Sequence, residues 1–346
     1  MLGVTGGSGN WLHIGNPGED VSVPVAVIIP AYNAERFLDE TLESVGAQTA
    51  PPSEIIVVDD GSTDRTAEVA RRHRATVLSQ PNVGPSAARN AAIRYTDQPW
   101  VAFLDADDVW EPDKLAVQWQ AVQICPEAGA VFSDFVEFDA KGPVGAPYFS
   151  RKPHYWAIKR TEIAPGVMVC DRDSLGQQAL EGSFFAPSTL LVRRSLLLQI
   201  GLFDPGVWGR EDTDCILRLL TVCPTAVVER PLMRSRLHLT NLTQDHYRMA
   251  QAGIALAQRV IQNPTRYPAG AVEKYRKQWP VWELNAGRFA EDRGDLGGAR
   301  RHYMASWRLG GGFTALGSAV LSWFPTPVRG ATRALRHRLL PAGGRT

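Results

Sequence analysis

The sequence predicts an α/β fold with a doubly wound, mostly parallel sheet and a helical C-terminal extension. Continuous apolar runs rich in β-branched residues, such as Val23–Ile29, are typical of parallel strands buried on both faces. Segments with helical spacing separate these runs, and strands that alternate with helices indicate a parallel sheet. From about residue 245 onward the spacing is helical. We therefore expect three parts: a loose leader at 1–22, an α/β domain at 23–243 and a helical region with a basic tail at 244–346.

The first half of the chain alternates strand and helix. We expect strands at Val23–Ile29, Glu54–Val58, Ala75–Leu78 and Val101–Leu104, and helices at 34–48, 63–73 and 86–95. Polar turns follow three of these strands, and ligands of such sheets bind at the carboxyl ends of the strands. The turns therefore predict a site at one edge of the sheet.

The second half has a looser pattern. We expect strands at Ala130–Phe135 and Thr189–Val192, and an acidic turn that leads into a helix at Trp208–Leu220. Residues 140–180 contain several Pro and Gly, and we interpret them as a variable region. Residues 283–309 have the spacing of one tetratricopeptide-type hairpin. Such a hairpin has to pack on a neighbour, because it cannot bury its own face alone.

The net charge of +1 hides an asymmetry. After Asp295 the chain has eight Arg and no Asp, Glu or Lys, so residues 296–346 carry +8 and residues 1–295 carry 1 − 8 = −7. The overall balance argues against a nucleic-acid partner, because proteins that bind nucleic acids usually have an excess of basic residues. The basic end indicates an anionic partner. Its Trp and Arg within apolar stretches at 313–340 favour an interfacial helix on an anionic membrane surface, and a helix docked on the protein is the alternative.

The sequence shows no pattern typical of a zinc site, a signal peptide or a membrane span. The four cysteines include no CxxC pair, so we expect buried thiols and no zinc site. The N-terminus has no basic region followed by an apolar one, and no run of about 18 apolar residues predicts a membrane span. We expect a cytoplasmic protein that is peripheral at the inner face of the cell membrane.

Two carboxylates follow the strand at Val101–Leu104. Asp105 and Asp107 are spaced i and i+2, so they can converge on one hard cation. Oxygen ligands suit Mg²⁺ or Mn²⁺, which keep positions open for phosphate oxygens. Such a cation neutralises a diphosphate leaving group. A solvated acidic turn is the alternative.

A second acidic turn, Asp59–Asp64, follows the strand at Glu54–Val58. Its carboxylates suit hydrogen bonds from a base or a ribose. Turn and helix-cap chemistry is the alternative, above all for Asp64. A phosphoacceptor pocket of the receiver-domain kind is a third interpretation, which the chain length and the turn at 105–108 disfavour.

These pieces together resemble family 2 glycosyltransferases over residues 23–243. The matching segments occur in the family's order: Pro30–Asn33, Val57–Asp64, Asn82–Gly84, Ala88–Asn90 and Phe103–Asp108. The resemblance implies a GT-A fold, a nucleotide-diphosphate sugar donor, a divalent cation (Mn²⁺ or Mg²⁺) and inversion at the anomeric carbon. By position it places Pro30, Tyr32 and Glu35 in the nucleotide pocket, Asp59 or Asp60 on the base, Arg89 near the base or phosphates, Asp105 on the ribose or cation, and Asp107 on the cation.

An inverting transfer needs one general base from a distant segment. The family has an acidic pair where this chain has Glu211 and Asp212. We assign the base to Asp212, with Glu211 in reserve, and we expect Asp214 to be a surface or capping residue. Stabilisation of a helix N-terminus is the alternative role for these acids.

Two further segments match the family by position. Arg236 and His238 resemble its terminal R-x-H element, so Arg236 is expected at the diphosphate and His238 at the cation or a phosphate. Phe184 and Phe185 fall near the acceptor, where they either stack on a sugar or a lipid-linked carrier or belong to the core.

The resemblance implies transfer of a sugar, with a UDP-sugar favoured, to a glycan or lipid-linked acceptor in surface polysaccharide synthesis. One alternative is a sugar nucleotidyltransferase, although such enzymes have a Gly-rich basic loop where this chain has Pro30–Asn33. The other is a catalytically silent scaffold that binds sugar nucleotides. The intact Asp105, Asp107 and Asp212 disfavour the silent scaffold.

Overall fold

The computed structural model describes residues 22–238 and 244–323. The chain divides into two compact units. The first, which we call the α/β unit, consists of Met1–Asn241 and Thr265–Ala269, and the second, the helical unit, consists of Leu242–Pro264 and Gly270–Thr346. Almost all of the expected leader, and the tail after residue 323, lie outside the described residues.

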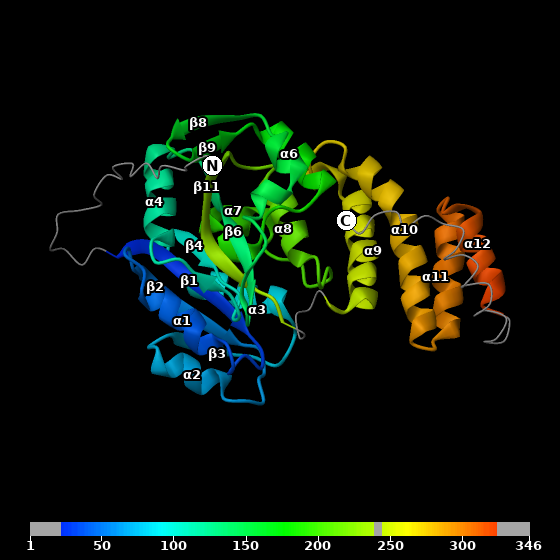
Figure 1. The fold of residues 1–346 in the computed structure, drawn as a ribbon, viewed down its shortest axis with the longest axis horizontal. Helices are drawn as coiled ribbons and strands as arrows, with labels where there is room; N and C mark the ends of the chain where they lie inside the picture. Colours follow the sequence, from blue (N-terminus) through cyan, green and yellow to red (C-terminus); the bar gives the residue numbers. More distant parts are fainter. Residues whose placement is uncertain (1–21, 239–243, 324–346) are drawn as a thin grey trace, which may run out of the picture. The chain divides into compact units, whose positions relative to one another are not determined.

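One sheet runs through the α/β unit (Figure 1). Its strands are β1 (Val23–Ala31), β2 (Pro52–Asp59), β3 (Thr76–Ser79), β4 (Trp100–Phe103), β5 (Val109–Trp110), β6 (Ala130–Asp139), β7 (Gly142–Val144), β8 (Arg160–Ala164), β9 (Val167–Cys170), β10 (Leu191–Arg193) and β11 (Thr225–Arg236). The strand order is β3-β2-β1-β4-β10-β6-β11-β9-β8, with β5 against β11 and β7 against β6. Strands β1 to β4 pair in parallel, as do β6 and β11, while β10 is antiparallel to both of its neighbours. The sheet is therefore parallel in its first half and mixed in its second.

Helices cover both faces of this sheet. They are α1 (Leu38–Gly46), α2 (Thr66–Arg72), α3 (Pro85–Tyr95), α4 (Lys114–Ile124), α5 (Pro153–Trp156), α6 (Arg172–Glu181), α7 (Arg194–Ile200) and α8 (Glu211–Leu219). Strand β1 shows why both faces are buried. Val25, Val27 and Ile29 pack into a core shared with α1 and α4, whereas Ala26 and Ile28 pack into one shared with α3 and α8. This period of two is the one expected of a strand.

The structure confirms the strands and helices expected up to residue 104, and it adds elements in the second half. Residues 140–180 form β7, β8, β9 and α5, and most of α6. The long central strand β11 was not expected, because Glu229–Pro231 interrupt its apolar run and the register shifts on both sides of Pro231. Phe184 and Phe185 belong to the core, where Phe185 stacks on Phe132 with ring centres 3.8 Å apart.

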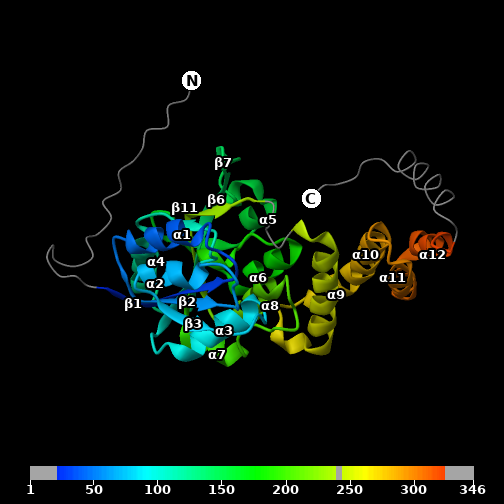
Figure 2. The same ribbon diagram turned by 90° about the horizontal axis from the view of Figure 1, so that it is seen from below.

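The helical unit contains α9 (His246–Gln262), α10 (Ala271–Asp292), α11 (Leu296–Arg308) and α12 (Gly312–Leu321), which pack together in this order (Figure 2). Helices α10 and α11 form the expected hairpin. They approach closely at Gly287, where a Cβ atom would lie 2.5 Å from Cδ1 of Tyr303. Within the described parts of the chain, no helix has the length and apolar character needed to cross a membrane.

Candidate active site

The turn after β4 is held in place by neighbouring elements. The backbone N–H of Asp105 donates to Oγ of Ser188 (3.0 Å), and that hydroxyl donates to Oδ2 of Asp108 (2.7 Å). From α1, Thr41 donates to the carbonyls of Ala106 and Asp108 at 3.0 and 2.9 Å. The Asp105 and Asp107 carboxylates therefore stand on a fixed backbone. Their side chains keep 35% and 28% of their surface exposed.

Arg89 joins this turn to the start of α8. Its Nη2 donates to Oδ1 of Asp105 (2.7 Å) and its Nη1 to Oε1 of Glu211 (3.2 Å), and the residue is only 3% exposed. Burial alone lowers the pKa of an arginine, but the charges of Asp105 and Glu211 outweigh burial and raise the pKa of Arg89. The bridge brings together the two acidic segments that the sequence assigned to opposite sides of the site.

Glu211 and Asp212 differ in what their oxygens do. Glu211 is buried, and its second oxygen, Oε2, accepts from the backbone N–H of Gly209 (2.8 Å). Asp212 is half-buried, and its Oδ1 accepts from the N–H of Thr213 (2.6 Å). Among the described residues, its Oδ2 has no hydrogen-bond partner. Burial, and next the charge of Glu211, raise the pKa of Asp212 to about 6, which suits a base.

Asp214 is not a surface or capping residue, so that expectation was wrong. The residue is fully buried on the other side of α8. Its Oδ2 accepts from Nε of Arg218 (2.9 Å), and its Oδ1 accepts from the hydroxyl of Tyr267 (2.6 Å). Arg218 in turn donates to the carbonyls of Ile200 and Leu202. The cluster fixes α8 on its inner face.

The end of β11 lies against the turn after β4. His238 Nε2 is 2.8 Å from Oδ2 of Asp107, and the backbone N–H of Arg236 donates to Oδ1 of Asp108 (3.0 Å). The Arg236 side chain donates to the carbonyl of Asp107 (2.9 Å) and pairs with Glu40 on α1. Burial and the charge of Asp105 raise the pKa of Asp107, against the effect of the His238 hydrogen bond. The predicted R-x-H element therefore meets the predicted metal turn.

The second acidic turn organises the ends of β2 and β3. Asp60 accepts from Nε2 of Gln80 (2.7 Å) and from the backbone N–H groups of Val83 and Gly84. Asp59 accepts from the N–H of Ser62 (3.0 Å). The Asp60 carboxylate is thus engaged in fixing the loop before α3. Asp64 makes a turn contact just before α2: its Oδ1 accepts from the N–H of Thr66 (3.0 Å), two residues on.

The end of β1 and the residues after it line the same sheet edge. Pro30 pairs in register with Val58 of β2, and Tyr32 is half exposed. Glu35 accepts from the backbone N–H of Arg65 (3.0 Å) and forms an ion pair with its side chain. Because β2, β1 and β4 are parallel neighbours, their carboxyl ends meet at one edge. The predicted residues accordingly form two groups there, one at β1 and β2 and one around Arg89 and Asp107.

The chemistry of the acidic turn fits a divalent cation. Asp105 and Asp107 offer oxygen ligands. The pKa of the neighbouring Asp108 is raised mainly by burial, and next by the charges of Asp107 and Asp105. A cation relieves such repulsion. In the described residues no three His, Cys, Asp or Glu side chains are grouped for coordination. A cation held by these two carboxylates would keep positions open for phosphate oxygens.

Comparison with known proteins decides the family. Residues 26–178 match the model of glycosyl transferase family 2. The putative teichuronic acid biosynthesis glycosyltransferase TuaG of Bacillus subtilis is 34% identical over 204 residues, which cover 56% of this chain and 77% of that protein. The chain belongs to glycosyl transferase family 2. These two matches confirm the resemblance to the family that the motifs of the sequence indicated.

Solved structures confirm the fold of the glycosyltransferase. TarS 1–349 of Staphylococcus aureus, in complex with UDP-GlcNAc, aligns with a TM-score of 0.58 at 16% identity, covering 90% of this chain and 91% of that one. The mannosyltransferase PcManGT of Pyrobaculum calidifontis, in complex with GDP-Man and Mn²⁺, aligns with a TM-score of 0.54 at 20% identity, covering 95% and 88%. The shared architecture is the GT-A type, as expected.

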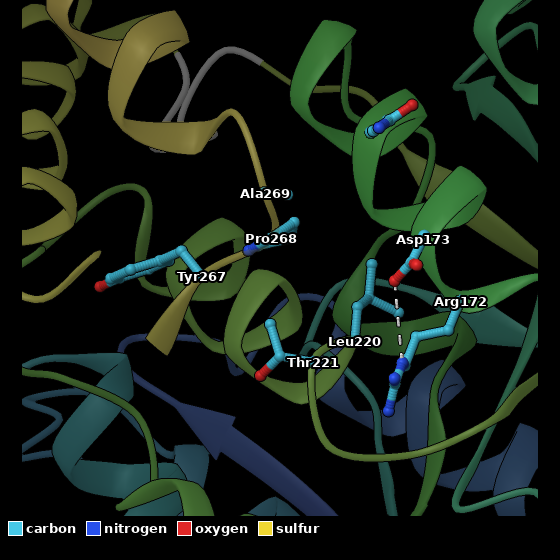
Figure 3. Close-up of a pocket in the computed structure, with 8 residues that line it drawn as sticks. Arg172, Asp173, Leu220, Thr221, Tyr267, Pro268 and Ala269 are labelled. Carbon is cyan, nitrogen blue, oxygen red and sulfur yellow. Dashed lines mark ion pairs between the residues drawn. The ribbon is translucent and has the colours of Figure 1, made fainter. Parts of the chain in front are cut away.

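The structure adds residues that sequence reasoning missed. Ser188 and Thr41 hold the acidic turn, and Tyr267 holds α8, yet no motif marks any of them. Tyr267 also lines a pocket of about 190 Å³ between α6 and the loop before α10 (Figure 3). None of the predicted site residues lines this pocket. The candidate site lies elsewhere, at the sheet edge where Arg89 joins Asp105 and Glu211.

Proposed function

We propose that the protein is an inverting, metal-dependent glycosyltransferase that moves a sugar from a nucleotide-diphosphate sugar to a hydroxyl group of a glycan or lipid-linked acceptor. One observation carries the proposal: Arg89 ties Asp105 of the acidic turn to Glu211, directly beside Asp212. A diphosphate-binding turn and a base with raised pKa thereby share one site. The names of relatives support the rest. TuaG is named for teichuronic acid, a surface polymer, and TarS binds UDP and UDP-GlcNAc, so a UDP-sugar is the favoured donor.

In this proposal, the donor side of the site is built from the sheet edge. Pro30, Tyr32, Glu35, Asp59 and Asp60 surround the nucleoside. Asp105 and Asp107 would hold Mn²⁺ or Mg²⁺, with His238, which contacts Asp107, as the candidate further ligand. The bound cation would offset the charge of the leaving diphosphate. Arg89 and Arg236 add positive charge next to the same phosphates. PcManGT was solved with Mn²⁺ and GDP-Man, which supports a cation at this place in the fold.

Asp212 acts as the general base. Its Oδ2 accepts the proton of the acceptor hydroxyl while that oxygen attacks the anomeric carbon, and the bond from this carbon to the diphosphate oxygen breaks. Attack from the face opposite the diphosphate inverts the configuration. Glu211 is the weaker candidate, because Arg89 and Gly209 engage both of its oxygens. We assign this chemistry to residues 23–243, and we place the enzyme in the cytoplasm, where the donor and a lipid-linked acceptor meet.

The test uses a panel of UDP- and GDP-sugars with Mn²⁺, with release of the nucleoside diphosphate and the anomeric configuration of the product as readouts. Asp212→Asn should lower turnover by about 10²–10⁴-fold, as loss of a general base does. Asp173→Asn is the matched control, because Asp173 also lies in the first turn of a helix but has an exposed side chain. Full turnover by Asp212→Asn would contradict the base assignment.

The alternatives predict other products. A nucleotidyltransferase would release inorganic diphosphate from a nucleoside triphosphate and a sugar phosphate. A silent scaffold would bind the sugar nucleotides with metal and release nothing across all acceptors.

A further inference from the structure

Helix α12 (Gly312–Leu321), in the helical unit, has its small residues inside and its large apolar residues outside. The buried positions are Ala315, Ser318 and Ala319, and Ser322 follows just after the helix. Ala319 packs into a cluster with Ala299 and Tyr303 of α11. The helix is thus anchored by a face of small side chains, which is the reverse of the usual amphipathic arrangement.

The outer face of α12 is an apolar stripe. Phe313 is 90% exposed, Val320 52% and Trp323 72%, and Leu316 between them is half-buried. Phe313, Leu316 and Val320 are spaced i, i+3 and i+7, which places them on one side of α12, and Trp323 follows two residues after the helix ends. Helix α12 itself has no charged residue. We call Phe313, Leu316, Val320 and Trp323 the outer stripe.

The Arg300 side chain borders the outer stripe, and two further arginines of α11 are exposed. The Arg300 guanidinium lies 3.9 Å from the ring centre of Trp323, and its Nη2 donates to the carbonyl of Ser322 (3.0 Å). Arg301 and Arg308 of α11 are exposed. The sequence continues this bias, because five more Arg and no acidic residue follow Trp323. An apolar stripe with Trp and Arg at its border matches the interface of an anionic bilayer, where rings enter the headgroup level and arginines meet phosphates.

We propose that the outer stripe docks on the surface of a lipid bilayer with anionic headgroups. Charge selects this occupant over two others. A second copy that packed the same face against itself would bring two acid-free, Arg-rich segments together. The chain's own residues 324–346 have the same sign of charge as Arg300, Arg301 and Arg308. The docking is independent of the transfer reaction and concerns where the enzyme works.

The test is co-sedimentation of the full chain with vesicles of phosphatidylcholine containing phosphatidylglycerol, and with vesicles of phosphatidylcholine alone. Wild type should bind the anionic vesicles, and raised salt should weaken the binding. The variant Phe313→Ser, Val320→Ser, Trp323→Ser should bind at least about tenfold more weakly, since each apolar group inserted adds to the affinity. The variant Arg301→Glu, Arg308→Glu should lose the preference for anionic lipid.

The control variant Val281→Ser, Trp156→Ser removes apolar residues that are 53% and 52% exposed on other helices, and it should bind as wild type does. Thermal melts show that each variant folds, and donor binding by the stripe variant should equal that of wild type. Equal vesicle binding by the stripe variant and wild type would overturn the proposal. So would a concentration-dependent dimer that the stripe variant loses, because the stripe would then belong to a second copy.

Discussion

At the scale of single residues, the adjacent acids Glu211 and Asp212 differ in their hydrogen-bond partners. Both carboxylate oxygens of Glu211 accept hydrogen bonds, one from Arg89 and one from Gly209. Asp212 has one carboxylate oxygen without a hydrogen bond among the described residues. Burial at this end of α8 removes water from the Asp212 carboxylate and raises its pKa to about 6. A carboxylate with such a pKa is ionised at neutral pH and still basic enough to take a proton.

This pKa predicts the pH dependence of turnover. Below about pH 6 Asp212 becomes protonated and can no longer accept the acceptor's proton, so kcat should fall about tenfold per pH unit. Above pH 6 the base is ionised and kcat should level off. The profile is measured from pH 4.5 to 8.5 at saturating donor, with Asp212→Asn as the comparison. An Asp212→Asn profile that keeps the same inflection would assign it to another group.

At the scale of elements, the loop between α9 and α10 contacts the buried face of α8 and holds this helix in place. The loop residue Tyr267 donates to Asp214, and Asp214 pairs with Arg218. Pro268 of the same loop fits against Gly176 of α6, where a Cβ atom would lie 2.9 Å away. Although the loop is remote in sequence from α8, it belongs to the α/β unit. If Asp212 is the base, as we propose, we expect its position to depend on Tyr267, which contacts no substrate in that proposal.

Tyr267→Phe tests this positioning role. Loss of the hydroxyl leaves a buried carboxylate oxygen of Asp214 without its donor, which should cost about 1–3 kcal/mol of stability. It should also lower kcat, and leave donor KM nearly unchanged. Tyr155→Phe is the matched control, because Tyr155 is buried and donates to Glu229 (2.7 Å). Equal kcat in both variants, at equal loss of stability, would leave Tyr267 with a structural role alone.

At the scale of the whole molecule, local patterns predicted the strands and helices of the first half of the sheet and the polar turns at its edge. β-branched runs and polar strand ends are local signals, so β1 to β4 and the turns after β1, β2 and β4 were accessible from sequence. Strand β11 was not, because Pro231 breaks its pattern and pairing with β5, β6 and β9, which are distant in sequence, holds the strand in place. Asp214 looked like a cap for the same reason: its partner Tyr267 lies 53 positions away.

Buried polar contacts were equally invisible. Lys114 is fully buried with its Nζ 2.7 Å from Oε1 of Gln118 and 4.0 Å from the ring centre of Trp110, and burial holds its pKa well below the usual value. No sequence rule places a lysine in a core. Such contacts arise from the tertiary packing of α4 on the sheet, which local spacing does not encode.

In our proposal, the turn at Asp105 and Asp107 binds a donor diphosphate together with a divalent cation. The most direct measurement is calorimetric titration of UDP and of GDP into the protein, with Mn²⁺ and with chelator. Wild type should bind one of the two nucleotides at least about tenfold more tightly with Mn²⁺, a gain of about 1.4 kcal/mol. Asp107→Asn should lose this gain, and Asp139→Asn, at the end of β6, should keep it. Equal affinity with and without Mn²⁺, or a full gain in Asp107→Asn, would contradict the account.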